Sequence, residues 1–288
     1  MRCLLAPAKL NLTLEVLGRR PDGYHTLRSL MVPIALYDRI ELEPSAQPSF
    51  TSDDPALAED NLVMRALAAV GAGDRFAVRL HKTVPAGGGL GGGSSDAAAI
   101  VRAAMDGELG VPAPSDPLGS ARALGADVPF FLAGTAALVE GIGERVTPLG
   151  ALPPWWVVVV RPPLAIGTAA AYGLLDRARE SAPPLSRPRA SSATLAASDA
   201  LQRADFAALL EHLHNDFGEP IGAAYPEVAH AAEALRAAGA RAALLSGSGS
   251  CLFALASDEG EARALAERLA PSAGRVFVAP FHHEARWR

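Results

Sequence analysis

The sequence predicts an α+β protein of two domains, and three observations lead to this fold class. Segments that alternate apolar and polar residues, as strands do, are interleaved with segments whose apolar residues recur at helical spacing. A length of 288 residues is more than one hydrophobic core usually serves. A Pro153-Pro154 pair breaks the pattern near the middle of the chain. We therefore expect domains of residues 1–153 and 154–288.

The first domain is predicted to open with a strand and a turn. From Lys9 to Val16, leucine and valine alternate with polar residues, which is typical of a strand with one buried face. Lys9, Asn11 and Thr13 then share the polar face. The Pro-Asp-Gly sequence at 21–23 favours a reversal of the chain. Further strands of this domain are predicted at residues 34–42, 76–80, 136–140 and 145–149.

Helices are predicted where a polar cap precedes a helical apolar pattern. Asn61 is expected to cap a helix that runs to Val70, and another helix should begin near Ser95. Residues 181–192 are rich in Pro, Ser and Arg, which predicts a surface loop, either a plain connector or a lid. The remaining predicted elements are helices at 115–124, 199–213, 226–238 and from Asp258, and strands at 155–160, 242–245, 251–256 and 275–279.

The composition excludes several functional classes. A net charge of -5 gives no electrostatic reason to bind nucleic acid or an anionic membrane. The most apolar stretch, residues 155–160, is far shorter than the roughly 20 residues of a membrane span, and the N-terminal residues lack the apolar core of a signal peptide. Two cysteines are too few for a disulfide framework. We expect a cytoplasmic monomer or homodimer whose partners are small molecules, with no nucleic acid and no membrane among them.

A glycine-rich loop is the strongest chemical signal in the chain. Six of the seven residues from Gly87 to Gly93 are glycine, and Ser94 and Ser95 follow at the start of the predicted helix. Glycines without Cβ atoms let backbone N–H groups converge on phosphate oxygens, and a helix N-terminus adds a positive dipole end. The loop therefore predicts a polyphosphate site.

Two better-known glycine loops fit less well. Gly87, Gly89 and Gly92 match the dinucleotide pattern G-x-G-x-x-G, but no acidic residue ends a second strand about 20 positions later. No Lys-Ser or Lys-Thr pair follows the glycines, as a P-loop requires. A phosphate cradle of a third kind remains.

Lysine is almost absent from this chain. Of the 26 basic residues only Lys9 and Lys82 are lysine, and the others are arginine. A lysine that persists in such a background suggests a site that needs a compact ammonium group, although chance retention stays open.

The glycine segments carry a family resemblance. PAGGGLGGGSSDAA, at residues 85–98, resembles the phosphate motif of the GHMP kinases, and LLSGSGSCLFAL, at residues 244–255, resembles their C-terminal glycine motif. The resemblance implies an N-terminal domain like ribosomal protein S5 domain 2, a C-terminal ferredoxin-like domain, and an active site between them that uses ATP and Mg²⁺. Residues 6–38, 60–66 and 125–134 are similar to the branch that phosphorylates a cytidylated sugar alcohol diphosphate in non-mevalonate isoprenoid synthesis.

The same resemblance implies roles for individual residues. Lys9 and Asp127 match the catalytic pair, with Asp127 as the base and its apolar neighbours Val128 to Phe131 favouring basicity. No residue is assigned as a metal ligand. The ATP-binding residues would be Asn61, Leu62, Lys82, Pro85, Ala86, Gly87, Gly88, Gly89, Leu90, Gly91, Gly92, Gly93, Ser94 and Ser95. The substrate-binding residues would be Asn11, Tyr24, His25, Thr168, Tyr172, Gly247 and Ser248, with Tyr24 and Tyr172 on either side of the cytosine and His25 at its edge.

Other functions stay open at this point. Asp96 stands where relatives often have Asn, and residues 166–168 vary the usual run before Tyr172, departures from the family pattern that leave the phosphate loop intact. A homoserine or sugar kinase of the same family would keep the glycine loop without needing Tyr24, His25 and Tyr172. A nucleotide-binding protein without catalysis would keep the loop and could dispense with Lys9 and Asp127.

Overall fold

The computed structural model describes residues 1–57, 61–181 and 192–282. Its strands are β1 (Arg2–Arg19), β2 (His25–Pro44), β3 (Ser49–Ser52), β4 (Phe76–His81), β5 (Ala136–Gly141), β6 (Arg145–Gly150), β7 (Trp156–Arg161), β8 (His214–Asn215), β9 (Leu244–Leu245), β10 (Leu252–Ala256) and β11 (Arg275–Pro280). Its helices are α1 (Leu62–Ala69), α2 (Gly92–Met105), α3 (Pro117–Leu124), α4 (Val128–Ala133), α5 (Thr168–Ser181), α6 (Ala193–Gln202), α7 (Phe206–His212), α8 (Gly218–Ala224), α9 (Pro226–Ala237) and α10 (Glu259–Glu267). The predicted α+β class is confirmed.

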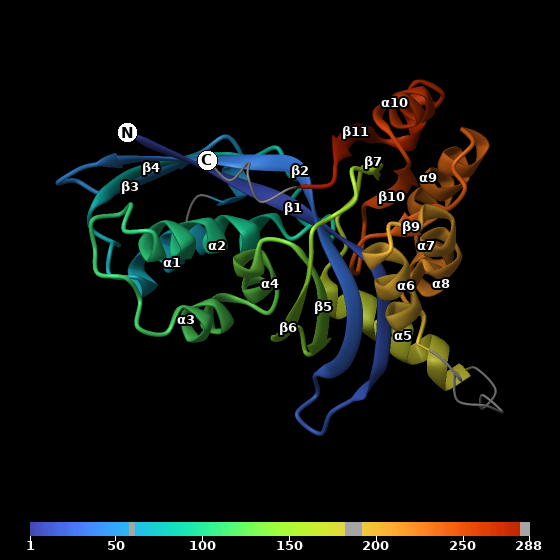
Figure 1. Ribbon diagram of the computed structural model, residues 1–288, viewed down its shortest axis with the longest axis horizontal. Helices are drawn as coiled ribbons and strands as arrows, with labels where there is room; N and C mark the ends of the chain where they lie inside the picture. Colours follow the sequence, from blue (N-terminus) through green and yellow to red (C-terminus); the bar gives the residue numbers. More distant parts are fainter. Residues whose placement is uncertain (58–60, 182–191, 283–288) are drawn as a thin grey trace.

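The first sheet is built around the long antiparallel pair β1 and β2, which crosses the molecule in Figure 1. Within the described residues its order is β3-β4-β2-β1-β8, and β5 pairs with β2 and with β6. Helices α1 to α4 lie on one side of this sheet. Their apolar residues form a core with β2 and β4 that includes Ile40, Val78, Ile100 and Phe130.

The second sheet is antiparallel, with the strand order β11-β7-β10-β9 in the part of the chain that is described. Numbered along the chain, these strands stand in the order 4-1-3-2, with helices after the first and third, as in a ferredoxin-like domain. Alternate residues of β7 belong to two different hydrophobic cores. Val158 and Val160 pack with α5, α8, α9 and α10, while Val157 and Val159 face the other way.

An apolar core joins the two sheets. Val157 and Val159 of β7 pack in one cluster with Leu10 of β1 and Val32 of β2. Helix α6 and strand β8 both follow residue 153 in the chain, yet α6 packs on β1 and β8 pairs with β1. The two halves are therefore held together by an apolar core and by contacts to β1, and the division at residue 153 remains a prediction.

Strand β1 differs from the prediction in one respect that matters for the site. It was expected to have one exposed polar face, but Lys9, Asn11 and Thr13 are all buried. The reason is tertiary packing, since the second half of the chain covers this face. Thr13 Oγ1 lies 2.8 Å from Thr194 Oγ1 at the start of α6, and Asn11 Nδ2 donates to Ser29 Oγ at 2.8 Å.

Several other expectations need correction. The predicted helix at 199–213 is two helices, α6 and α7, separated at Ala204, which has a positive φ of 53°. Helices α4, α5 and α8 and strands β3 and β8 were not predicted, because their short apolar patterns are ambiguous without tertiary context. Helix α2 begins at Gly92, three residues earlier than expected. The possible lid at 181–192 lies almost wholly outside the described residues.

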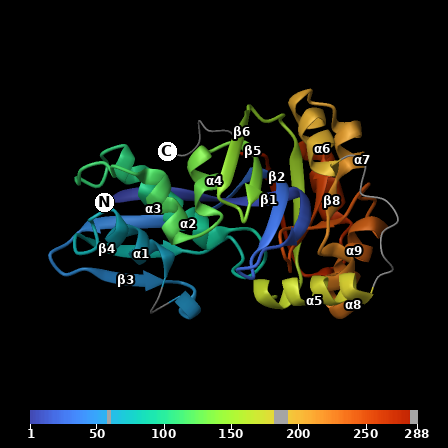
Figure 2. The ribbon, with the colours of Figure 1, turned by 90° about the horizontal axis from the view of Figure 1, so that it is seen from below.

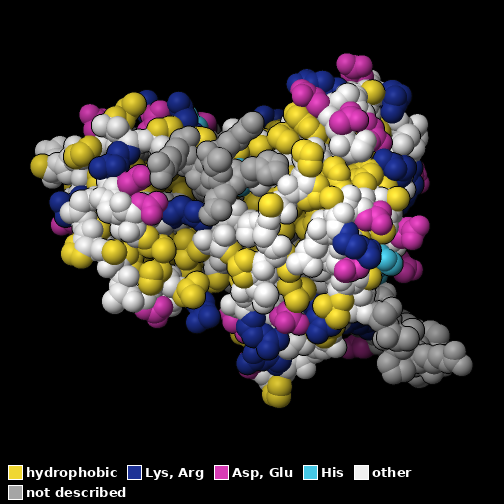
Figure 3. Space-filling view, in the orientation of Figure 1, with side chains coloured by type: hydrophobic (Ala, Val, Ile, Leu, Met, Phe, Trp, Pro, Cys, Tyr) yellow, Lys and Arg dark blue, Asp and Glu magenta, His cyan; other side chains and the backbone are white. Residues whose placement is uncertain are grey.

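The surface agrees with the charge balance of the sequence. Over the face shown in Figure 3, acidic and basic side chains are interspersed and form no large patch of one sign. Among the helices that the structure describes, none combines the length and apolar character that crossing a bilayer would require.

Candidate active site

A cleft of about 520 Å³ lies where β1, the glycine loop, α1, α2, α5 and the turn before β10 meet. Figure 2 shows how β1 and β2 run from one half of the molecule into the other, which brings these elements together. All of the predicted site residues line the cleft except Tyr24, His25 and Ser95. Leu14, Leu27, Leu57, Val63, Leu80, Asp96 and Phe217 line it as well.

The glycine loop is shaped by close packing around it. Gly91 is the N-cap of α2 with φ 72°, and a Cβ there would lie 2.9 Å from the Phe131 ring and 3.1 Å from Lys9 Cγ. A Cβ on Gly89 would lie 2.0 Å from the Ser246 carbonyl oxygen. A Cβ at either position would clash, and Gly92 and Gly93, whose N–H groups belong to the unpaired first turn of α2, line the cleft. The arrangement is typical of an anion site at a helix N-terminus.

Lys9 is fixed at the centre of the cleft. Its backbone N–H donates to Leu90 O at 3.0 Å, and its Nζ donates to Asn11 Oδ1 at 2.5 Å. Burial lowers the pKa of Lys9 below the ordinary 10.5, while the charge of Asp127 opposes that shift. Asn11 was expected to contact substrate, and here its amide oxygen and nitrogen are engaged by Lys9 and Ser29. Asn11 thus orients the ammonium group.

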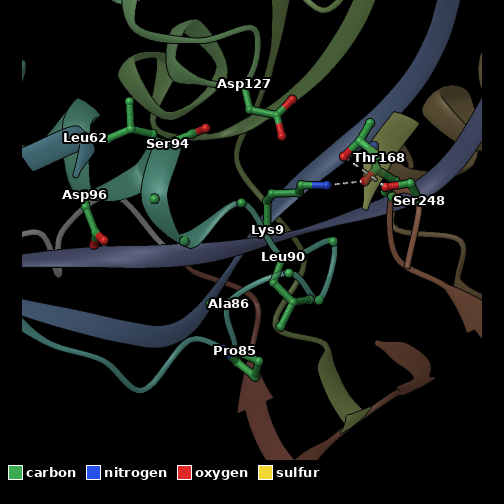
Figure 4. A pocket seen from close by; sticks show the side chains of 18 of the residues that line it. Lys9, Leu62, Pro85, Ala86, Leu90, Ser94, Asp96, Asp127, Thr168 and Ser248 are labelled. Atoms are coloured by element: carbon green, nitrogen blue, oxygen red, sulfur yellow. Dashed lines mark hydrogen bonds between the residues drawn. The ribbon is translucent and has the colours of Figure 1, made fainter. Parts of the chain in front are cut away.

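Asp127 faces the same space from the other side. In Figure 4 its carboxylate and the Lys9 side chain enter the cleft from opposite sides. It stands at the N-cap position of α4, but its side chain makes no capping hydrogen bond, which argues against the alternative that it is only a helix cap. Asp127 is half-buried, whereas its apolar neighbours Val128 and Phe130 are buried in the core. The carboxylate is therefore open to a ligand and less desolvated than the sequence suggested.

Lys82 forms an ion cluster with two carboxylates next to the glycine loop. Its ammonium donates to Asp38 Oδ2 and, at 2.9 Å, to Asp96 Oδ2, and both carboxylates are buried. Burial works to lower the pKa of Lys82, but the two negative charges outweigh it and raise that pKa. Burial raises the pKa of Asp96 to about 7. Lys82 thus lines the cleft while tying β2 to α2, a partnership the sequence did not reveal.

The predicted adenine end of the cleft lies beside α1. Asn61 caps this helix by accepting from Met64 N at 2.9 Å, and Leu62 lines the cleft next to it. Figure 4 shows Leu62 and Asp96 on the side of Ser94 that is remote from Thr168. Ser95 is wholly buried and does not line the cleft, so its predicted contact with ATP remains a prediction.

The second glycine turn closes the cleft opposite the loop. Ser246 Oγ donates to Gly89 O at 3.0 Å, and a Cβ on Gly247 would lie 3.1 Å from Lys9 Nζ. Asn215 Nδ2 donates to the carbonyl oxygens of Leu245 at 2.7 Å and Gly247 at 2.9 Å. Asn215 is a supporting residue that sequence reasoning missed, because its partners are 30 and more positions away and no motif marks it.

The aromatic residues gather at the end of the cleft that Thr168 and Ser248 also line. Tyr172 stacks on His25 with ring centroids 4.4 Å apart and an interplanar angle of 20°, and its other neighbour is the edge of Phe217. Burial and the charges of Asp127 and Asp176 raise the pKa of Tyr172. Tyr24 is 62% exposed and does not line the cleft, so the expected sandwich is not preformed.

Two family models match the chain. The model described as GHMP kinases N terminal domain matches residues 61–135, and the one described as GHMP kinases C terminal matches residues 197–275. The first contains the glycine loop and Asp127, and the second contains the Gly247 turn. Both segments that carried the sequence resemblance are thereby included.

Relatives match over nearly the whole chain. A protein from Symbiobacterium thermophilum named 4-diphosphocytidyl-2-C-methyl-D-erythritol kinase is 40% identical, covering 94% of this chain and 96% of its own length. A protein of the same name from Deinococcus radiodurans is 41% identical over 92% of this chain and 87% of its own.

Solved structures also match over nearly the whole chain. A crystal structure titled 4-(cytidine 5'-diphospho)-2C-methyl-D-erythritol kinase superposes with a TM-score of 0.79 at 38% identity, covering 98% of this chain and 100% of that one. Homoserine kinase from Cytophaga hutchinsonii, at 19% identity and a TM-score of 0.67 over 98% and 95% of the two chains, shares the fold. On the matches of its two halves and of its full length, this chain belongs to the GHMP kinase family.

Proposed function

We propose that this protein is an ATP-dependent kinase that phosphorylates the 2-hydroxyl of 4-diphosphocytidyl-2-C-methyl-D-erythritol, a step in non-mevalonate isoprenoid synthesis in the cytoplasm. The observation that carries the proposal is the placement of Lys9 and Asp127 on opposite sides of one space beside the N-terminus of α2. The identity of about 40% to full-length relatives of that name supports the choice of substrate.

The phosphates of ATP would bind at the glycine loop. Backbone N–H groups at the start of α2 are strong donors, and no acidic residue in the first turn of that helix opposes a phosphate. The adenine would lie toward Asn61 and Leu62, at the opposite end of the cleft from Thr168. The γ-phosphoryl group would then lie between the loop and Lys9.

The residues also fit a magnesium ion bound with ATP. Mg²⁺ usually takes one or two protein oxygens and otherwise phosphate oxygens and waters. The Ser94 hydroxyl lines the cleft at the start of α2, beside the phosphate region, and it would hold the ion together with phosphate oxygens and waters. Mg²⁺ would supply charge neutralisation on the phosphate oxygens.

Lys9 and Asp127 would have different roles in phosphoryl transfer. Asp127 accepts the proton of the substrate hydroxyl as its oxygen attacks phosphorus, which is general base catalysis. The Lys9 ammonium, held by Asn11, stabilises the negative charge on the transferred phosphoryl oxygens. The proton ends on Asp127 and the leaving group is ADP.

The cytidine of the substrate would bind near His25 and Tyr172. Because the two rings are nearly parallel, a base that hydrogen-bonds to the edge of His25 in its plane would also lie parallel to Tyr172. Tyr24, exposed at the neighbouring turn, would cover the remaining face of the base. Each stacked ring contributes roughly 1–3 kcal/mol.

A panel of acceptors tests the function. Release of ADP from ATP is measured with the cytidylated methylerythritol, homoserine, mevalonate and galactose as separate acceptors. We expect turnover with the first alone. Turnover with homoserine or galactose, and none with the cytidylated compound, would identify another kinase of the family.

A further inference from the structure

A hydrogen bond between His25 and Asp176, beside the aromatic cluster, has no role in the reaction so far. His25 Nε2 lies 2.8 Å from Asp176 Oδ1, although the two residues are 151 positions apart in the chain. His25 begins β2 and Asp176 lies on α5, one helical turn after Tyr172. The side chain of His25 is only 8% exposed. The pair thus joins the β1–β2 hairpin to the helix that carries Tyr172.

The identity of the partner places a proton on Nε2 of His25. An ionised carboxylate only accepts hydrogen bonds, so Nε2 of His25 must carry a proton when it bonds to Asp176. In the neutral ring Nδ1 then has the lone pair. Arg19 Nη1 lies 3.9 Å from the other oxygen of Asp176.

An acceptor at Nδ1 distinguishes between pyrimidines. Cytosine carries an amino group, a donor, where uracil carries a carbonyl oxygen, an acceptor. The lone pair on Nδ1 accepts a hydrogen bond from the amino group of cytosine. Opposite the carbonyl oxygen of uracil, two acceptors would face each other with no proton between them. If the proton moved to Nδ1, the preference would be reversed.

We propose that Asp176 is a positioning residue that fixes the protonation of His25 at Nε2 and thereby makes the cleft select an amino-bearing pyrimidine over a carbonyl-bearing one. The inference rests on the proposed function. It adds a residue that does not line the cleft and that contacts His25 behind Tyr172.

The test uses Asp176→Asn, because an amide is nearly the same size but both donates and accepts. Imidazole can then bond to it in either form, so Nδ1 is no longer held as an acceptor. We measure kcat and KM for the cytidine and uridine forms of the substrate, with ATP saturating. The ratio of kcat/KM for cytidine over uridine should fall roughly tenfold or more, through KM, while kcat and the KM for ATP stay near wild type.

Two further variants separate positioning from a general structural role. Asp176→Glu keeps an obligatory acceptor and should recover much of the cytidine preference. Arg19→Gln removes the exposed neighbour of Asp176, leaves the bond to His25 in place, and should change the ratio little. Melting temperatures establish that each variant is folded.

The outcomes are distinguishable. A folded Asp176→Asn enzyme that keeps the wild-type ratio overturns the inference and leaves the proposed function intact. Equal loss of activity toward both substrates, without a change in their ratio, also overturns it, because that is the behaviour of a structural contact. Wild-type enzyme that phosphorylates neither substrate overturns the proposed function and this inference with it.

Discussion

The two ends of the cleft are built differently. At the phosphate end, the glycine loop, Lys9 and Asn11 are joined by hydrogen bonds and enclosed by the core. At the aromatic end, Tyr24 lies exposed on a turn, and His25 and Tyr172 meet from distant segments. The difference indicates that the phosphoryl-transfer groups are organised before substrate binds, whereas the base site is completed by its ligand.

The largest effect is expected at the phosphate end, from Asp127→Asn. The amide cannot accept the hydroxyl proton, so turnover should fall by roughly 10²–10⁴. ATP affinity, measured by calorimetry, should change little because the loop is untouched. Turnover near wild type would remove Asp127 from the role of base.

Gly91→Val tests whether the loop is as tightly enclosed as its packing indicates. The new Cβ would strain a backbone with φ 72° and press on Phe131 and Lys9. ATP should bind roughly 10- to 100-fold more weakly, about 1.4–2.8 kcal/mol.

Gly110→Val is the matched control for that substitution. Gly110 has a similar φ of 63°, and a Cβ there meets nothing within 4 Å. The control should keep wild-type ATP affinity despite equal backbone strain. Equal loss in both variants would show that the effect comes from backbone strain and not from packing around Gly91. Unchanged ATP affinity in a folded Gly91→Val variant would place the phosphate site elsewhere.

Tyr24→Ala examines the open end of the cleft. Loss of one stacked ring should raise the KM for the cytidylated substrate roughly tenfold, within the 1–3 kcal/mol range of such contacts. The KM for ATP and the melting temperature should stay constant, since Tyr24 is exposed. An unchanged substrate KM would mean that the base binds without Tyr24.

The smallest effect concerns the cluster of Lys82, Asp38 and Asp96. With its pKa raised to about 7, Asp96 holds a proton in the folded state between pH 3.8 and 7 that it loses when unfolded. Its contribution to stability is therefore greatest at acid pH and is lost as pH rises through this window.

Asp96→Asn removes that titration while it keeps an acceptor for Lys82. The gain in melting temperature over wild type should be larger at pH 8 than at pH 5, by about 2–4 °C for each kcal/mol. A gain that is the same at both pH values would show that Asp96 is ionised throughout.

The sequence predicted the features whose cause is local. Consecutive glycines between a strand and a helix define the loop, and a polar cap before an apolar pattern places α1 at Asn61. Features that depend on distant segments were not predictable. The polar face of β1 is buried because α6 packs on it, and no local signal joins Lys82 to Asp38 or His25 to Asp176.

The most direct test of the account is the identity of the phosphorylated product. Wild-type enzyme, ATP and 4-diphosphocytidyl-2-C-methyl-D-erythritol are incubated, and the product is examined by ³¹P NMR. The account predicts one new phosphomonoester resonance, on the oxygen at C2, in amounts equal to the ADP formed. ADP without that resonance, or a phosphoryl group on another hydroxyl, would contradict the placement of the acceptor between Lys9 and Asp127.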